Sequence, residues 1–481
     1  MAIACTQEQF SPFLEEFQTM AHEVLDKWLE GFRPFFESEE PPGLEALSNH
    51  FQKTRSEFMS ACMQAAIEKL FPHMIEQTQA PCPRCGKSLS RKRSDERKVS
   101  TMQGKFSIWR PYFYCADCHH GFHPLDKVLR LAPQHHQHDV QRRVVKTAAR
   151  VPFAETAEQF EELSGVMVGN HFSHETLNAV ADVAALENVI PQREEINARI
   201  QRATVASGPP PVLVVASDGA MTPTRPQAPR KTKRGRGRYR EVKGVRIYLI
   251  GPEKRIIHVA SWHQIQEADE FTEDLIRIAE RIDVSRVRVA LLGDGAGWLW
   301  NAMTKAFPQG RQILDYYHCA EHVWKVADHL YPEGSLEAHE WAEATLVRLC
   351  LGKIKETVAD LETLNPRDTQ AREEVQKLIT YLNNNAHRID YLENLDAGYA
   401  IGSGGIESAN KFISHTRMKR SGAWWIEPYG NGMLRIRCAM YNGTYDRLFN
   451  QYAGKASLKR CWLSSLTRFS SCAVRSFEPY G

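Results

Sequence analysis

Apolar and polar positions change their period along the chain, and this change predicts where helices and strands lie. Near the N-terminus apolar residues recur three or four positions apart, so residues 7–36 and 43–76 are predicted to be helices separated by Pro41-Pro42-Gly43. Residues 153–165 and 173–186 repeat the helical pattern, the first ended by a glycine and the second opened by a serine cap. This is the outline of a helix-turn-helix, although a plain three-helix packing unit has the same pattern.

The middle of the chain has continuous apolar runs, which are typical of buried central strands. PVLVVASDG ends in Asp218, VRVALLGDG ends in Asp294, and RQILDYYH contains a short strand ending in Asp315. Between the first two, VRIYLIG and KRIIHVASW are joined by Gly251-Pro252-Glu253 and should pair as a hairpin. With two amphipathic helices, the order strand, strand, strand, helix, strand, helix, strand predicts an RNase H-like core.

The overall composition is that of an ordinary globular protein. Forty-two per cent apolar and 25% charged residues exclude a largely disordered or fibrous chain. No stretch reaches the roughly 20 apolar residues of a membrane helix, and the N-terminus lacks a basic region followed by an apolar one. Eleven cysteines, an odd number spread over the whole chain, do not indicate a disulfide scaffold. We therefore expect a cytoplasmic protein in a reducing compartment, without membrane contact.

The net charge of +3 conceals strong segregation. Residues 81–150, 225–246 and 401–481 carry +10, +9 and +8, whereas residues 1–80 and 331–398 carry −8 and −6. Basic blocks separated by acidic ones indicate a path for a polyanion. Any single block can equally be an ordinary solvated surface.

Four of the cysteines have the spacing of metal ligands. Cys82 and Cys85 form one C-x2-C motif, and Cys115 and Cys118 form a second one, with 29 residues between the two motifs. Two tight turns with two thiolates each suit one tetrahedral structural Zn²⁺, whereas a redox motif needs a single pair. The sequence therefore predicts a zinc ribbon, in which nearby histidines are surplus ligands and basic residues between the motifs contact phosphate. The histidines are His119, His120 and His123, and the basic residues are Arg91, Lys92, Arg93, Arg97 and Lys98.

The predicted fold is a multidomain α/β protein whose RNase H-like core is interrupted by an all-helical insertion. The insertion is acidic and rich in helix formers, and the core follows a helical N-terminal region, the zinc ribbon and the helix-turn-helix. The predicted regions are the helical N-terminal region (1–79), the zinc ribbon (80–130), the helix-turn-helix DNA-binding domain (135–190), the first part of the core (208–330), the insertion (331–398), the second part of the core (399–450) and a basic C-terminal tail (451–481). A recognition helix starting at Ser173 would offer His174, Thr176 and Asn178 to base edges.

Two aspartates occupy equivalent places in the apolar strands. Asp218 and Asp294 each end an apolar run and are followed by Gly-Ala, so adjacent parallel strands would bring their carboxylates side by side. Glu407 follows the break Gly402-Ser403-Gly404-Gly405 at the start of a helix and could return to the same edge. Three such acids can hold two Mg²⁺ for an in-line displacement at phosphorus. An Asp-Gly pair after a strand is also a common turn.

Several motifs resemble a known family. LLGDGAGWLWNAMTKAFPQGRQILDYYHCAEHVWKVA resembles the stretch around the second catalytic Asp of DDE transposases with a helical insertion, the Mutator-like and related bacterial insertion-sequence groups. SGGIES resembles the motif around their Glu, and RMKRSGAWW, MLRIR and NGTYDRLF resemble the C-terminal part of ISKra-type insertion-sequence transposases. The resemblance covers roughly residues 80–450. It implies that Asp218, Asp294 and Glu407 are the DDE triad, with His318 a further catalytic candidate at the third position after Asp315. His318 can equally be a structural histidine at the end of the strand.

The resemblance has departures. Many bacterial DDE enzymes have Lys or Arg seven residues after the Glu, where this chain has Ser414, and Lys411 is the nearest substitute. Trp298 and Trp300 are candidates for stacking on a flipped base or for ordinary packing positions. The loop between the strand of Asp218 and the next strand is a candidate phosphate clamp. The further basic candidates for DNA contact are Lys231, Arg234, Arg236, Arg238, Lys411, Arg417, Lys419 and Arg420.

The resemblance implies an Mg²⁺-dependent DDE transposase, a polynucleotidyl transferase of a bacterial insertion sequence. Such an enzyme binds the terminal repeats of its element as a homo-oligomer, a dimer on paired ends, and joins the freed 3′-hydroxyl to target DNA by transesterification. It would use two Mg²⁺ per active site and one structural Zn²⁺, and would be associated with the nucleoid when bound to double-stranded DNA. Two alternatives stay open: a non-catalytic DNA-binding regulator derived from a transposase, and an RNase H-fold nuclease that cleaves without joining.

Overall fold

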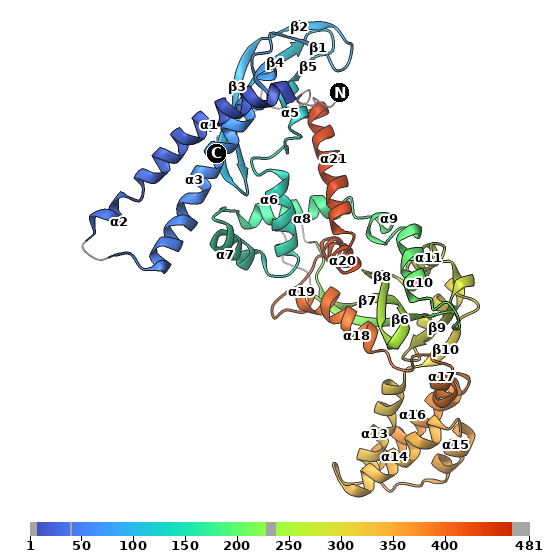
Figure 1. Cartoon of the computed structure of the whole chain (residues 1–481). Helices are drawn as coiled ribbons and strands as arrows, with labels where there is room; N and C mark the ends of the chain where they lie inside the picture. The colour runs from blue at the N-terminus through green and yellow to red at the C-terminus, as the bar shows by residue number, and fades with distance from the viewer. Residues whose placement is uncertain (1–6, 39–40, 228–236, 464–481) are drawn as a thin grey trace, which may run out of the picture. The chain divides into compact units, whose positions relative to one another are not determined.

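The computed structural model describes residues 7–38, 41–227 and 237–463 (Figure 1). The chain forms two compact units: unit 1 comprises residues 1–179 and 449–481, and unit 2 comprises residues 180–448. The finer division into seven regions stays a prediction. Within the described residues, no helix combines the length and apolar content needed to cross a membrane.

Unit 1 begins with helices where the apolar pattern predicted them. They are α1 (Gln7–Glu30), α2 (Arg33–Glu37), α3 (Leu44–Leu70) and α4 (Pro72–Ile75). α1 and α3 pack through aromatic side chains, because the Trp28 ring lies 4.8 Å from Phe32 and 5.0 Å from Phe51. Trp28 Nε1 also donates a hydrogen bond to Thr54 Oγ1 at 2.9 Å, which fixes one helix against the other.

Short antiparallel strands follow the helices of unit 1. They are β1 (Gln79–Pro81), β2 (Ser88–Ser90), β3 (Arg93–Thr101), β4 (Gly104–Cys115) and β5 (His120–Phe122), with the short helix α5 (Pro124–Val128) after them. β1 pairs with β2, and β3, β4 and β5 form a three-stranded sheet. Each C-x2-C motif therefore lies in a tight connection between two strands.

The predicted helix-turn-helix region contains three helices, and the third starts earlier than predicted. The helices are α6 (His138–Ala148), α7 (Phe153–Ser164) and α8 (Asn170–Ala181). α7 ends at Gly165, whose φ of 71° is the left-handed conformation that glycine adopts readily. Ser173 is buried inside the first turns of α8 and its hydroxyl donates to Gly169 O at 3.1 Å. Ser173 is therefore not the cap of this helix.

Unit 2 contains a five-stranded sheet with the order β10-β9-β6-β7-β8. The strands are β6 (Val212–Thr224), β7 (Arg238–Ile250), β8 (Ile256–Ile265), β9 (Arg288–Gly293) and β10 (Arg311–Leu314). β6, β9 and β10 are parallel, whereas β7 is antiparallel to both β6 and β8. The predicted hairpin and the predicted order of strands and helices are confirmed.

Helices cover both faces of this sheet, which explains why its strands are apolar on both sides. α11 (Ala268–Ala279) and α12 (Gly297–Ala306) lie on one face, where Phe271 contacts Trp298. α18 (Gly404–Asn410) and α20 (Glu427–Asn442) lie on the other face, and His258 of β8 is hydrogen-bonded to Asn442. Between them run the π-helix Lys411–His415 and the short α19 (Thr416–Met418). Unit 2 also contains α9 (Leu186–Val189) and α10 (Arg193–Ala203), and α21 (Tyr445–Leu463) follows α20.

In the sequence, a group of helices follows β10 and precedes α18, and Figure 1 shows these helices gathered together. These helices are α13 (Tyr316–Leu330), α14 (Leu336–Cys350), α15 (Ile354–Thr363), α16 (Thr369–Asn385) and α17 (Tyr391–Asp396). α13 packs against α14 and α16. The helical region therefore begins at Tyr316, before the acidic composition that set its predicted start at residue 331.

Candidate active site and metal centre

Asp218 and Asp294 come together where β9 ends beside β6. The parallel pairing of these strands ends at Ala216 opposite Leu292, so each aspartate stands two residues beyond the last pair. The prediction that the first strand ends at Asp218 is wrong. β6 runs on to Thr224, paired with β7, so Asp218 lies inside a strand and not in a turn.

The Asp218 carboxylate is held by two hydrogen bonds. The backbone N–H of Gly219 donates to Oδ1 at 2.7 Å, and Asn410 Nδ2 donates to Oδ2 at 2.7 Å. The pKa of Asp218 is raised, mainly by burial of the carboxyl group. The hydrogen bond from the Gly219 N–H and the charge of His318 lower this pKa, whereas the charges of Asp294 and Glu407 raise it. Electrostatic effects decline with distance, so the structure brings the four predicted catalytic side chains into one neighbourhood.

Asn410 and His263 are site residues that sequence reasoning missed. Asn410 is buried on α18, one turn after Glu407, and its Oδ1 accepts a hydrogen bond from His263 Nε2 at 2.9 Å. Because Asn410 donates to Asp218 through Nδ2, its oxygen faces His263, and this assigns the proton of His263 to Nε2. Burial lowers the pKa of His263 to about 4, so the ring is neutral at pH 7. The result is a chain of hydrogen bonds from the sheet through α18 to Asp218.

α18 is docked on the sheet by contacts around Gly405. Arg246 of β7 donates to Gly405 O, and a Cβ at Gly405 would lie 2.9 Å from the Tyr248 ring. Glu407 itself is exposed. Ser414 is buried, and its hydroxyl donates to Asn410 O at 2.9 Å. Lys411 is exposed, so it is the accessible cation after Glu407.

The contacts of Asp315 are those of a residue that holds elements of the fold together. It is fully buried at the N-terminus of α13, where Oδ1 accepts from the N–H of His318 at 2.8 Å and Oδ2 accepts from the N–H of Ser403. Tyr316 N–H donates to Ile401 O at 2.9 Å. Asp315 therefore joins α13 to the segment that leads into α18. The half-buried His318 has Nδ1 at 3.6 Å from Glu321 Oε2.

The loop after β9 is fixed by the helical region. Asp294 Oδ1 accepts from Ala296 N–H at 2.9 Å, and the hydroxyl of Tyr381 in α16 donates to Asp294 O at 3.1 Å. Gly295 has a φ of 106°, and a Cβ there would lie 3.2 Å from the Tyr381 ring. The helical region thus helps to set the position of Asp294.

Trp298 and Trp300 of α12 have packing partners. Trp300 is buried, with the Arg388 guanidinium 4.2 Å from its ring centroid. Trp298 is half-buried between Phe271 and the ammonium group of Lys243, which lies 4.5 Å from its ring centroid. These contacts favour the packing interpretation, most clearly for Trp300.

The four cysteines converge as predicted. Their Sγ atoms all lie within 4.8 Å of one another, and Cys85 Sγ is 3.7 Å from Cys115 Sγ. Tetrahedral Zn²⁺ with Zn–S bonds of about 2.3 Å would separate two sulfurs by about 3.8 Å. A hydrogen bond from the Cys85 backbone is the largest effect on Cys82 and lowers the pKa of its thiol to about 7. The cluster could therefore hold a metal such as zinc.

Protein contacts also join the two cysteine turns. Lys87 Nζ lies 2.8 Å from Asp117 Oδ2, and Arg84 donates to Cys118 O at 3.2 Å. Of the nearby histidines, His123 is hydrogen-bonded to Asp95 at 3.1 Å. Among the residues that the structure describes, only the cysteines gather three or more possible ligand atoms of His, Cys, Asp or Glu this closely. The carboxylates of Asp218, Asp294 and Glu407 are more widely spaced than such a closed site.

Burial divides the predicted DNA contacts of unit 1. Arg91, Lys92 and Arg93 are exposed, and Arg93 also pairs with Asp95 at 2.7 Å. In α8, Thr176 is buried, which removes it from the candidate base contacts. His174 and Asn178 are half-buried, with 3.2 Å between His174 Nε2 and Asn178 Nδ2.

The basic candidates of unit 2 divide in the same way. Arg238, Lys411 and Lys419 are exposed, and Arg420 is half-buried. Arg417 is buried with its guanidinium 5.1 Å from the Trp425 ring centroid, so it is an interior residue and not a DNA contact. Lys231, Arg234 and Arg236 lie outside the described residues.

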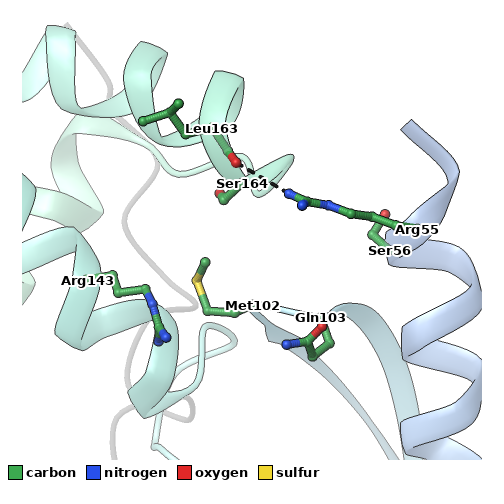
Figure 2. Close-up of a pocket in the computed structure, with 7 residues that line it drawn as sticks. All are labelled: Arg55, Ser56, Met102, Gln103, Arg143, Leu163 and Ser164. Carbon is green, nitrogen blue, oxygen red and sulfur yellow. Dashed lines mark hydrogen bonds between the residues drawn. The ribbon is translucent and has the colours of Figure 1, made fainter. Parts of the chain in front are cut away.

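Unit 1 also has a polar pocket of about 220 Å³ beside α3, α6 and α7. Figure 2 shows Arg55 and Arg143 on opposite sides of it. Arg55 donates to Leu163 O at 3.3 Å and Arg143 donates to Asp139 O at 3.1 Å. These contacts hold both guanidinium groups against helix carbonyls.

The sheet, the helices and the thiol cluster define a multidomain α/β protein with a four-cysteine site that could bind zinc. The chain belongs to the Uncharacterised protein family (UPF0236), whose family model matches residues 43–451. No curated protein matches the chain. Among solved structures, the Drosophila P element transposase strand transfer complex is similar over 66% of this chain and 81% of that chain, with 10% identity and a TM-score of 0.25. A likeness this weak does not bear on the fold or the function.

Proposed function

We propose that the protein is a DDE-type DNA transposase with an RNase H-like core. The observation that carries this proposal is the proximity of Asp218, Asp294 and Glu407 at one edge of the sheet: burial raises the pKa of Asp218, and the charges of the other two carboxylates raise it further. The two aspartates stand at equivalent points of neighbouring parallel strands, and Glu407 lies on α18, which packs against β6 and β7. The strand order, with β6 central and only β7 reversed, is also the order expected of that core.

The carboxylates suit Mg²⁺ in their chemistry. Within the described part of the chain, Asp218, Asp294 and Glu407 form no ion pair, and their mutual repulsion is relieved by a divalent cation, which prefers oxygen ligands. Bound Mg²⁺ would activate the attacking oxygen and stabilise the leaving oxygen at phosphorus. The chain itself orients Asp218 through Gly219 and Asn410, and His318 favours the ionised carboxylate.

DNA recognition would come from the other modules. The four-cysteine module with Arg91, Lys92 and Arg93 would contact phosphates, and α8 would offer His174 and Asn178 to base edges. In this proposal a homodimer holds the two element ends, and the 3′-hydroxyl released by cleavage attacks target DNA directly. A structural Zn²⁺ would hold the two cysteine turns together.

Alanine variants of Asp218, Asp294 and Glu407 test the catalytic part. We expect each to lower Mg²⁺-dependent nicking and strand transfer by more than about 100-fold, since even supporting residues of metal sites contribute 10–100-fold. The triple variant should be hardly worse than the worst single variant, because the acids act as a unit. The assay uses DNA that carries the element's own ends, and Asp269→Ala, an exposed aspartate of α11, is the matched control.

The outcomes separate the alternatives. Binding to the element ends should survive in all variants. Near-normal activity of Glu407→Ala would contradict the triad. Binding without any Mg²⁺-dependent cleavage by the unaltered protein would favour a regulator, and cleavage without joining would favour a nuclease.

A further inference from the structure

Beyond the sheet, β6 and β7 continue as a two-stranded ribbon. The pairing of β6 with β9 ends at Ala216, and the pairing of β7 with β8 ends at Val242, whereas β6 and β7 stay paired as far as Thr224 and Arg238. A third segment joins the ribbon: Trp425 N–H donates to Pro223 O at 3.1 Å. Arg225 N–H donates in turn to Trp425 O at 2.8 Å.

The ribbon carries a row of rings on one side, which we call the aromatic row: Tyr239, Pro223 and Trp424. In the pairing of β6 with β7, Tyr239 lies directly opposite Pro223. Trp425 bridges to Thr224 in parallel, so the residues before them, Trp424 and Pro223, also lie beside each other. Because side chains alternate between the two faces of a strand, the side chains of Tyr239, Pro223 and Trp424 are on the same face. Tyr239 is 62% exposed and Trp424 is 41% exposed, with ring centroids 6.0 Å apart. This is a large apolar surface at the end of a charged ribbon.

The next pair of residues along the ribbon, Thr224 and Trp425, has packing partners. Thr224 is buried, and Trp425 donates from Nε1 to Met418 O at 3.1 Å. The Trp424 ring is supported from the backbone, because a Cβ at Gly237 would lie 2.2 Å from it. Trp425 thus anchors the segment, while the neighbouring Trp424 is held in place with its ring accessible.

The charge around the aromatic row indicates its occupant. The sequence that joins β6 to β7 is rich in Lys and Arg, and of the described residues Arg238 is exposed beside Tyr239. A polyanion that also presents flat apolar rings matches this surface. Single-stranded DNA does so, because its bases can stack on aromatic side chains while cations hold the phosphates. In a duplex the base faces are already stacked on one another.

We propose that the aromatic row binds an unpaired DNA strand by base stacking. The row lies five residues beyond Asp218 along β6, about 17 Å at roughly 3.4 Å per residue, and on the opposite face of the ribbon, because five is an odd number of residues. A strand that stacks on the row would pass round the edge of the ribbon, so at roughly 3.4 Å per stacked nucleotide at least about five nucleotides separate it from a phosphate beside Asp218. The link to that phosphate rests on the proposed function, whereas the stacking itself is independent of catalysis.

The test is binding of a fluorescent 20-residue oligothymidylate and of a 20-base-pair duplex, without Mg²⁺. We expect Trp424→Ala and Tyr239→Ala each to weaken binding of the single strand by about 5- to 150-fold, the range measured for base stacking. Binding of the duplex should stay within about twofold, and the salt dependence should not change, because neither variant removes a charge.

Phenylalanine variants and a charge variant serve as controls. Trp424→Phe and Tyr239→Phe should restore most of the lost affinity, since stacking requires only a ring. Arg238→Ala should weaken both ligands and reduce the salt dependence. The proposal is overturned if the alanine variants bind oligothymidylate normally, if they lose both ligands equally, or if phenylalanine fails to restore binding. Inactivity of the unaltered protein in strand transfer would contradict the proposed function and leave this binding result standing.

Discussion

Each oxygen of the Asp218 carboxylate accepts one hydrogen bond and retains capacity for a second. The Gly219 N–H donates to Oδ1 and Asn410 Nδ2 donates to Oδ2. These two hydrogen bonds orient the carboxylate, which can still coordinate a cation. Asn410 cannot turn its amide around, because His263 donates to the oxygen. The orientation of the carboxylate therefore depends on Asn410 and His263, which are not among the proposed metal ligands.

Asn410→Ala should lower the affinity for Mn²⁺, used as a probe of the proposed Mg²⁺ site, by about 10- to 100-fold. The reason is that Asp218 loses the donor that orients it. Calorimetric titration measures the affinity, and the rate of DNA cleavage against Mg²⁺ concentration should show the same displacement of the midpoint. Asn431→Ala is the matched control, since Asn431 bonds only the backbone of Ile265 at the sheet edge. An equal displacement in both variants would contradict a positioning role.

The acids could be found from the sequence, whereas their supports could not. Asp218 and Asp294 follow apolar runs and Glu407 follows a glycine break, and each signal is local. Asn410 and His263 are 147 positions apart, and their types and spacing resemble those of any buried amide and histidine. Only the packing of α18 on the sheet brings them together.

Among the elements, α13 and α18 are joined by Asp315. Its two oxygens bind the N–H groups of His318 and Ser403, so one buried side chain caps one helix and fixes the approach to another. The sequence placed Asp315 at the end of a short strand, as it placed Asp218 and Asp294 at the ends of longer ones. Its full burial and its bonds to two separate elements identify it as a joint between those elements.

Asp315→Ala should reduce the free energy of unfolding by about 2–4 kcal/mol, because the helix loses its cap and Ser403 N–H is left without an acceptor. It should also lower DNA cleavage, since Glu407 follows this joint. Urea denaturation and the cleavage assay measure the two effects. Asp368→Ala removes the comparable cap of α16 and should cost only about 0.5–2 kcal/mol, with cleavage unchanged. Equal effects of the two variants on cleavage would contradict the joint.

The free energy of unfolding should depend on pH because of two histidines of β8, His258 and His263. Burial lowers the pKa values of His258 and His263 to about 4, below about 6.5 in an unfolded chain. The unfolded state therefore gains protons first, and stability present above pH 6.5 is lost as the pH falls toward 4, by up to roughly 1 kcal/mol per pH unit for each histidine. Urea denaturation between pH 7 and 5 should show this slope. His258→Gln should flatten it, and replacing the exposed His171 should not.

At the scale of the whole molecule, the two units contain different chemistry. Unit 1 holds the four thiols, whose local spacing made them predictable, because both C-x2-C motifs lie in tight connections between strands. Unit 2 holds the carboxylates, which converge from distant parts of the chain. The start of the helical region at Tyr316 was not predicted, because the acidic excess that marked the region was counted from residue 331, after α13 has ended.

Purified protein should contain about one zinc per chain, because the four thiolates complete one tetrahedral site. Removing the metal with a chelator should increase hydrogen exchange of residues 79–122, since metal binding is coupled to local folding. The sheet of unit 2 should keep its protection. Cys85→Ser is expected to reproduce the effect of the chelator. A metal content well below one per chain, or uniform loss of protection in both units, would contradict a local structural site.

The π-helix after α18 determines the rotational phase of the Glu407 helix. A π-turn accommodates one residue more than an α-turn, and one residue corresponds to about 100° of rotation in an α-helix. Shortening residues 411–415 by one position would restore a regular helix and turn Glu407 and Asn410 away from Asp218, while α20 kept its packing. The alignment of the acids therefore depends on the number of residues in this segment as much as on their identity.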